Sequence, residues 1–291
     1  MTRLAYLALG IGVLGVSTSS ILIKWMPLVP ALAIAAYRLG FTVLFLGPVA
    51  LATRRGELAE VGRRDVALSV LGGVFLAAHF AAWITSLKFT SVASSVVLVT
   101  LQPVFVLLGA RLLFGERVTR AGLLGVALAL GGGALIGWSD WQAGRQELQG
   151  DWLALVGALL VAFYLLVGRS VRRRLSVLPY TTLVYGAAAV LVAWSLLAGV
   201  PLYPYPWAAW LLFLALAVFP TIFGHTMFNY AIGHLPAGLV SVSILGEPVG
   251  AAALAYLLLG ERLSPLQAVG GLGVLAGIAV FAGAGTRAAK A

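Results

Sequence analysis

One acidic residue in the middle of a long apolar stretch raises the first question about chemistry. Glu247 lies in the segment SILGEPVGAAA, residues 243–253, about nine residues into an apolar run. Nine helical residues span roughly 14 Å, which is near the middle of a bilayer's hydrocarbon core. A carboxylate at that depth costs several kcal/mol unless it is protonated, paired or hydrated. Glu247 is therefore expected to face a helix-bundle interior, either as a site for a substrate amine or a proton, or as a lock between helices.

Two neighbouring features bear on this carboxylate. Pro248 follows it directly, removes a helix hydrogen bond and frees the carbonyl of Ile244, which is tolerated only where protein or water satisfies the freed group. Arg38, in the segment AAYRLG, lies about eight residues, or roughly 12 Å, from the end of its own apolar run. Because the two charges lie at similar depth, Arg38 either pairs with Glu247 or meets a substrate carboxylate.

A histidine and a tryptophan form a second candidate group. His79 and Trp83 are four residues apart and share one helix face, where they offer a polar tip and a flat ring to an aromatic ligand. The alternative for His79 is hydrogen-bonded packing. His225 and Asn229 repeat this spacing and are weaker candidates. Ser243, one turn before Glu247, is the one serine placed in the predicted substrate site, because membrane serines more often serve helix packing.

The elements that must position these residues follow from the composition. Of 291 residues, 62% are hydrophobic and 10% are charged, whereas soluble domains are about a quarter charged. The chain is therefore predicted to be an all-α integral membrane protein within the lipid bilayer. Ten apolar runs are each long enough to cross it. They are 4–24, 30–52, 66–87, 91–114, 119–138, 152–169, 180–200, 207–230, 238–259 and 265–285.

The basic residues orient these ten helices. With the N-terminus inside, fourteen of the 19 lysines and arginines fall in inner segments and four, namely Lys24, Lys88, Arg145 and Arg262, fall in outer ones. Such a bias predicts that both termini are cytoplasmic. It also accounts for the net charge of +10, so no nucleic-acid partner is expected.

The two halves of the chain repeat each other. The segments LQPV at 101–104 and GEPV at 246–249, and the two GER segments at 115–117 and 260–262, are all offset by 145 residues. Five helices per half invert the second half, which predicts two inverted-topology repeats, about 4–138 and 152–285, in a single transport domain 1–291. Substrate binds between the halves in such transporters. Gln102 and Pro103 then match Glu247 and Pro248, and the amide of Gln102 is expected to face the same cavity.

On the paired QPV and EPV segments, the two GER links and AAYRLG, the chain resembles the drug/metabolite transporter superfamily, in its ten-helix branch with two EamA repeats. Within that branch it is most similar to aromatic amino acid exporters. The resemblance implies export of amino acids or related metabolites across a bacterial cytoplasmic membrane. The family pattern carries a basic residue at the position of Arg38, which favours a structural role for it. Pro103 and Pro248 are likewise expected to shape helix packing.

Other functions find less support in the sequence. There is no cysteine, no GxxxxGK[ST] segment for ATP and no HExxH, so neither a cofactor nor a metal is expected. No two acidic residues lie at comparable depth in the predicted helices. A catalytic acidic pair is therefore not expected, and an intramembrane enzyme is disfavoured. A phosphate-antiporting or drug-exporting relative of the same fold is the alternative. Phosphorylated solutes call for several interior cations. Arg38 is the only interior cation of the predicted helices, which argues against such substrates. Monomer and homodimer both remain open.

Overall fold

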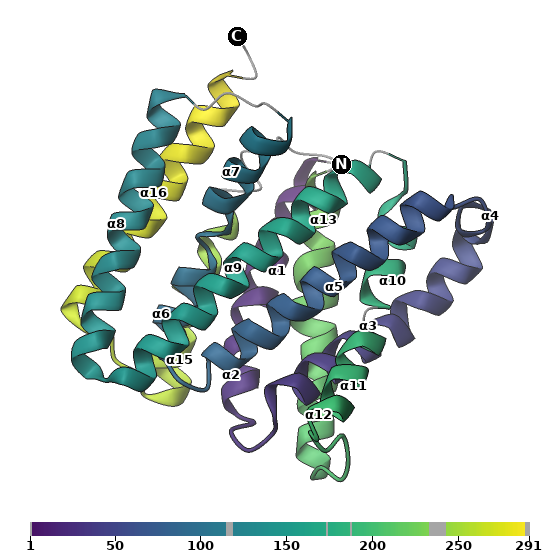
Figure 1. Cartoon of the computed structure of the whole chain (residues 1–291), viewed down its shortest axis with the longest axis horizontal. Coiled ribbons are helices and arrows are strands. Elements are labelled where there is room, and N and C mark those ends of the chain that lie inside the picture. Colours follow the sequence, from purple (N-terminus) through teal and green to yellow (C-terminus); the bar gives the residue numbers. More distant parts are fainter. Residues whose placement is uncertain (1, 115–118, 173, 187, 233–242, 289–291) are drawn as a thin grey trace.

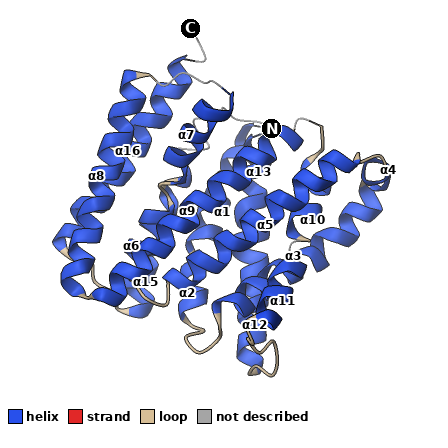
Figure 2. Cartoon of the chain, viewed as in Figure 1, coloured by secondary structure: helices blue, strands red, loops and turns tan. Residues whose placement is uncertain are grey.

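A computed structural model describes residues 2–114, 119–172, 174–186, 188–232 and 243–288. All regular elements in these ranges are helices (Figure 2). The first half contains α1 (Thr2–Ser17), α2 (Ser19–Lys24), α3 (Ala31–Thr53), α4 (Arg55–Ala59), α5 (Arg63–Ser86), α6 (Val92–Val99), α7 (Gln102–Phe114) and α8 (Arg120–Ala143). The second contains α9 (Arg145–Val171), α10 (Val177–Tyr185), α11 (Ala188–Leu197), α12 (Trp207–Leu216), the π-helix η1 (Ala217–Thr226), α13 (Met227–Ile232), α15 (Gly246–Leu259) and α16 (Pro265–Ala288).

These helices form the predicted multi-pass membrane bundle. Seven helical stretches of the described residues are long and apolar enough to cross a bilayer, and three shorter apolar helices begin at Val92, Gly246 and Pro265. Together they correspond to the ten predicted spans. The beginning of the ninth span, 238–242, lies outside the described residues.

One predicted loop is wrong. Residues 139–151 were expected to link two spans, yet α8 continues to Ala143 and α9 begins at Arg145. Gly144 alone separates the two helices. The polar residues of this segment include glutamine, glutamate and arginine, which are good helix formers, so helical structure extends beyond the apolar runs.

The bundle has two distinct ends. Helix α1 begins and α16 finishes at one end, called here the terminal end, at the top of Figure 1. The opposite end, called the far end, holds the α2–α3 and α11–α12 links at the bottom of Figure 1. Helix α5 packs along α9, and α8 packs along α16. The second pair approaches so closely that a Cβ atom on Gly132 would overlap the carbonyl oxygen of Gly270.

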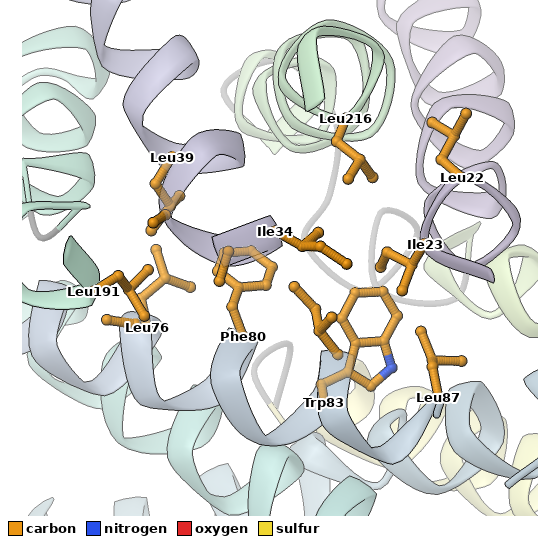
Figure 3. Packing of buried hydrophobic residues seen from close by; sticks show 14 of the residues in the cluster. Leu22, Ile23, Ile34, Leu39, Leu76, Phe80, Trp83, Leu87, Leu191 and Leu216 are labelled. Atoms are coloured by element: carbon orange, nitrogen blue, oxygen red, sulfur yellow. The ribbon is translucent and has the colours of Figure 1, made fainter. Parts of the chain in front are cut away.

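A layer of buried apolar side chains fills the bundle near the far end. Figure 3 shows Ile34, Trp83 and Leu216 extending from three separate helices toward a common centre. Ile23 and Leu87 complete this group, which we call the apolar layer. Each of the five side chains is at most 4% exposed, so the layer is closely packed around all of them.

Candidate functional site: a central cavity between two broken helices

The two repeats each have a turn at the equivalent position, directly before a helix that begins with a polar residue and a proline in its first turn. Helix α6 ends at Val99 and α7 begins at Gln102 after a turn at Thr100 and Leu101. In the second half a turn at Leu245 precedes α15, which begins at Gly246. Equivalent residues are again 145 apart. The sequence predicted kinks at these prolines, and the structure has a turn directly before each of the two proline-containing helices.

These turns place Gln102 and Glu247 at the start of α7 and α15. Pro103 and Pro248 follow them, still within the first turn, where a missing N–H costs no intrahelical hydrogen bond. The positive end of the helix dipole stabilises a negative charge at this position. Glu247 therefore obtains through helix geometry part of the stabilisation that a carboxylate at this depth requires.

A cavity of about 220 Å³ lies between the two halves. Five of the predicted functional residues line it, namely Arg38, His79, Trp83, Gln102 and Glu247. Ser243 does not line the cavity in the part of the chain that the structure describes, and neither do Pro103 and Pro248. The predicted role of Ser243 as a substrate ligand is thus unsupported by its position, although it lies one turn before Glu247.

Arg38 is hydrogen-bonded into the walls of the cavity. Its Nε atom donates to Thr221 Oγ1 at 3.0 Å, and its Nη1 atom donates to Ser19 Oγ at 2.9 Å. The guanidinium carbon lies 4.3 Å from the centre of the Phe80 ring, which favours a cation through its π-face. The side chain is 1% exposed. Arg38 therefore links α3 to α2, α5 and η1.

The predicted pairing of Arg38 with Glu247 is absent from the described residues, where no ion pair joins them. The guanidinium of Arg38 instead donates hydrogen bonds to the hydroxyls of Ser19 and Thr221. The glutamate carboxylate, by comparison, has no hydrogen bond or ion pair to another described side chain, and it faces the cavity. The two charges thus share a cavity, and each is stabilised separately.

The π-helix explains how Thr221 becomes available to Arg38. Pro220 cannot donate the backbone hydrogen bond of a regular α-helix, and η1 widens around it. The hydroxyl of Thr221 donates to the carbonyl of Leu216 at 2.9 Å, while its oxygen accepts from Arg38. Thr221 and this π-helix were missed in the sequence analysis, in which Pro220 within an apolar run was the available signal.

His79 and Trp83 occupy one wall of the cavity with parallel rings. Their centroids lie 6.1 Å apart at an interplanar angle of 4°. His79 Nδ1 lies 2.9 Å from the carbonyl oxygen of Gly157 on α9. Because a carbonyl only accepts, Nδ1 carries the hydrogen, and Nε2 of the neutral ring remains the acceptor. The two side chains are therefore neighbours on one helix face, positioned by contact with α9, and their role in substrate binding stays a prediction.

Other lining residues were weaker candidates or were missed. His225, a weaker candidate, lines the cavity, whereas the side chain of Asn229 lies outside the described residues. Tyr164 and Tyr185 also line it and were not identified. Both belong to apolar runs in which a tyrosine is unremarkable, so only the folded arrangement reveals them.

The apolar layer lies on the far-end side of the cavity. On each of four helical segments, the residue one turn nearer the far end than a lining residue is a buried apolar side chain. These residues are Ile23 beyond Ser19, Ile34 beyond Arg38, Leu87 beyond Trp83, and Leu216 beyond Pro220. These four side chains therefore lie between the cavity lining and the far end of the bundle.

A bundle of membrane-spanning helices in two halves, with discontinuous helices meeting at a central cavity, has the architecture of a secondary transporter. The chain belongs to the EamA-like transporter family, whose model matches it twice, over residues 3–138 and 148–283. This double match confirms the predicted repeat and the drug/metabolite transporter resemblance.

Similar proteins agree with this membership. An uncharacterized transporter of Archaeoglobus fulgidus is 30% identical over 226 residues, which cover 77% of this chain and 78% of that protein. A probable terminal-alkyne amino-acid exporter of Streptantibioticus cattleyicolor is 28% identical over 189 residues, covering 62% of this chain and 61% of the exporter. A solved crystal structure, 21% identical, covers 97% of this chain and is itself covered to 98%, with a TM-score of 0.68, which shows a shared fold. The protein is therefore a transporter by family.

Proposed function

We propose that this protein exports amino acids, aromatic ones included, and related small metabolites across a bacterial cytoplasmic membrane by alternating access. The observation that carries the proposal is the unequal use of the two charges in the cavity. Arg38 donates hydrogen bonds to two protein hydroxyls, whereas the carboxylate of Glu247 faces the cavity. A substrate ammonium group is the natural partner of such a carboxylate.

The remaining groups suit the other parts of an amino acid. The amide of Gln102 and the N-terminus of α7 are available to a substrate carboxylate. The parallel rings of His79 and Trp83 offer an apolar surface to a side chain, and His79 Nε2 offers an acceptor to a polar group. A cavity of about 220 Å³ favours a small metabolite over a large drug, because pockets for drug-sized ligands have volumes of about 300–1,000 Å³.

Phosphorylated solutes are disfavoured by the same geometry. Among the described lining residues Arg38 is the one arginine or lysine, and it is already held by Ser19, Thr221 and Phe80. A phosphate in the cavity would face Glu247 with no free arginine or lysine beside it. The relative named as an amino-acid exporter supports the same substrate class.

The orientation of the protein is also part of the proposal. The excess of basic residues on the terminal side supports a cytoplasmic position for both termini. The far end, where the apolar layer lies, would then face the outside of the cell. A reporter fused to the C-terminus would be active on the cytoplasmic side, and activity on the outer side would refute this orientation.

The experiment is counterflow in proteoliposomes, with and without a pH gradient, using labelled phenylalanine, alanine and glucose 6-phosphate. Both amino acids should exchange, and faster exchange of the sugar phosphate would refute the proposal. Glu247→Gln should retain the melting temperature and lose at least tenfold in amino-acid exchange, because the shape is kept and the charge is removed. Glu60→Gln, at an exposed carboxylate outside the spans, is the matched control. Wild-type exchange by Glu247→Gln would show that the charge has no part in substrate binding.

A further inference from the structure

Two buried carboxylates meet at the far end, outside the central cavity. Asp140 lies in the last turn of α8 and Asp151 lies two turns into α9, and they are 1% and 3% exposed. Thr90, in the link between α5 and α6, lies between them. Its Oγ1 atom is 3.1 Å from Asp140 Oδ2 and 3.1 Å from Asp151 Oδ1. The sequence analysis overlooked this pair because both residues fell in the segment predicted to be a loop.

The hydrogens of this group do not balance if both aspartates are ionised. A threonine hydroxyl has one hydrogen, so it can donate to only one of the two carboxylates. The other contact then joins two oxygens without a hydrogen between them, in a site from which water is nearly excluded. The contact becomes a hydrogen bond if the second aspartate is protonated and donates to Thr90 Oγ1.

The surrounding donors identify which aspartate remains charged. Gln267 on α16 accepts from the backbone N–H of Ser264 through Oε1, so its amide nitrogen faces Asp140 Oδ1 at 2.7 Å. Asp140 thus receives hydrogen bonds at both oxygens, as a carboxylate requires. Asp151 Oδ2 is buried and has no partner among the described residues. An unpartnered oxygen is tolerable on a neutral carboxylic acid and costly on a carboxylate.

We propose that Asp151 binds a proton and donates it in a hydrogen bond to Thr90, which in turn donates to Asp140. This proton-binding site holds the α8–α9 turn against the α5–α6 link and α16 at the far end. Loss of the proton would place two carboxylates beside one hydroxyl in a buried site and would separate these elements. This proton-binding site lies outside the central cavity and does not depend on which substrate that cavity binds.

The packing around Thr90 supports a fixed geometry. A Cβ atom on Gly150 would lie 2.8 Å from the backbone nitrogen of Thr90, so the link rests directly on the backbone of α9. Lys24 at the end of α2 donates to the carbonyl of Thr90 at 3.0 Å and pairs with Glu261 at 3.3 Å. Glu261 also accepts from the backbone N–H of Val92 at the start of α6. The link is therefore held from α2, α9 and the α15–α16 turn.

The charged groups near the site are distributed over all the elements packed against it. They are Lys24 on α2, Lys88 in the α5–α6 link, Glu147 on α9, and Glu261 and Arg262 in the α15–α16 turn. Lys24 is engaged by Glu261, and Lys88 donates to the carbonyls of Met26 and Pro27. Glu147, one turn before Asp151, adds a negative charge that further favours the proton. None of these cations makes an ion pair with Asp151 among the described residues.

The test combines infrared spectroscopy and thermal unfolding of the purified full-length protein in detergent. At neutral pH the wild type should show the C=O band of a buried carboxylic acid, and Asp151→Asn should lose that intensity, because the amide replaces the acid as donor to Thr90. The melting temperature of the wild type should fall by about 3–5 °C per pH unit where the proton is lost, and this part of the fall should be missing in Asp151→Asn. Glu60→Gln, at an exposed carboxylate between α4 and α5, should behave like the wild type.

Several results would overturn the proposal. One is a band and a pH profile in Asp151→Asn that match the wild type. Another is a melting temperature that rises with sodium or magnesium ions and is indifferent to acid, because the carboxylates would then bind a metal cation. If Asp151→Asn does not fold, Thr90→Val removes the shared hydroxyl instead. A wild-type pH dependence in Thr90→Val would also refute the shared proton, whereas a flattened one would support it.

Discussion

Replacing Arg38 by lysine is the most direct test of how the cavity is built. The guanidinium donates from Nε to Thr221 and from Nη1 to Ser19, at 3.0 and 2.9 Å, while its face lies on Phe80. A lysine ammonium keeps the charge but is a single point on a flexible stem. It cannot occupy both donor positions and stack on the ring. Arg38→Lys therefore separates the fork geometry from the charge.

The expected cost follows from the contacts that are lost. One hydrogen bond from a charged group contributes about 1.5–3 kcal/mol, and a weakened cation–π contact adds about 0.5–1 kcal/mol. The free energy of unfolding should thus fall by about 2–4 kcal/mol. That change corresponds to a drop in melting temperature of roughly 4–16 °C for a chain of this size. Arg63→Lys, at an exposed position at the start of α5, should change the melting temperature little.

A double-mutant cycle checks that the loss arises at the proposed partner. Thr221→Val should destabilise the wild type more than it destabilises Arg38→Lys, with a coupling energy of about 1–2 kcal/mol. Thermal unfolding of the four variants in one detergent gives both quantities. Additive effects, or a melting temperature of Arg38→Lys within about 1 °C of the wild type, would refute the structural role. Lost transport with unchanged stability would instead assign Arg38 to the substrate carboxylate.

Two further predictions concern the packing of the bundle and its terminal end. Gly132→Ala should lower the free energy of unfolding by about 1–3 kcal/mol, because the new methyl group meets the Gly270 carbonyl. Gly131→Ala is the control, because its Cβ meets nothing within 4 Å, and it should be neutral or stabilising. Equal melting temperatures of the two variants would refute the close contact of α8 and α16. Glu57 accepts from the backbone N–H and the hydroxyl of Ser176, and these hydrogen bonds lower the pKa of its carboxyl group. Its contribution to stability should therefore be present above about pH 4.3 and be lost as the pH falls through the lowered pKa, so the wild type should exceed Glu57→Gln in melting temperature at pH 7 and approach it in acid. A difference that does not depend on pH would contradict this origin.

The sequence predicted the main features of this fold because a membrane imposes strong constraints on composition. Apolar runs of about twenty residues identify the spans, and the 145-residue offset identifies the repeat. The same reasoning located Glu247 and Gln102, since a polar group in such a run needs an explanation. It could not distinguish a kink from a turn, because both follow from one missing hydrogen bond. The turns at Thr100 and Leu245 became visible only in the folded chain.

The partners of the buried charges were harder to predict than the charges themselves. Depth along a helix is readable from the sequence, but the direction in which a side chain points around the bundle is not. Arg38 and Glu247 were therefore matched by depth and opposite charge, whereas the guanidinium binds Ser19 and Thr221. Hydroxyls are numerous in apolar runs, so none of them stood out as a partner. The acidic pair at the far end was missed for the related reason that α8 and α9 extend beyond their apolar parts.

The separate stabilisation of the two central charges bears on what the cavity can bind. In a buried ion pair the two charges would neutralise each other and leave the cavity nearly neutral. Here the cation is satisfied by hydroxyls and an aromatic face, while the anion lies at a helix N-terminus and shares its cavity with Gln102, the amide at the equivalent position of the other repeat. The charge that remains for a ligand is negative. For that reason a ligand with an ammonium group is expected to bind more tightly than a neutral analogue of the same shape. Glu247→Gln is expected to remove this difference in affinity.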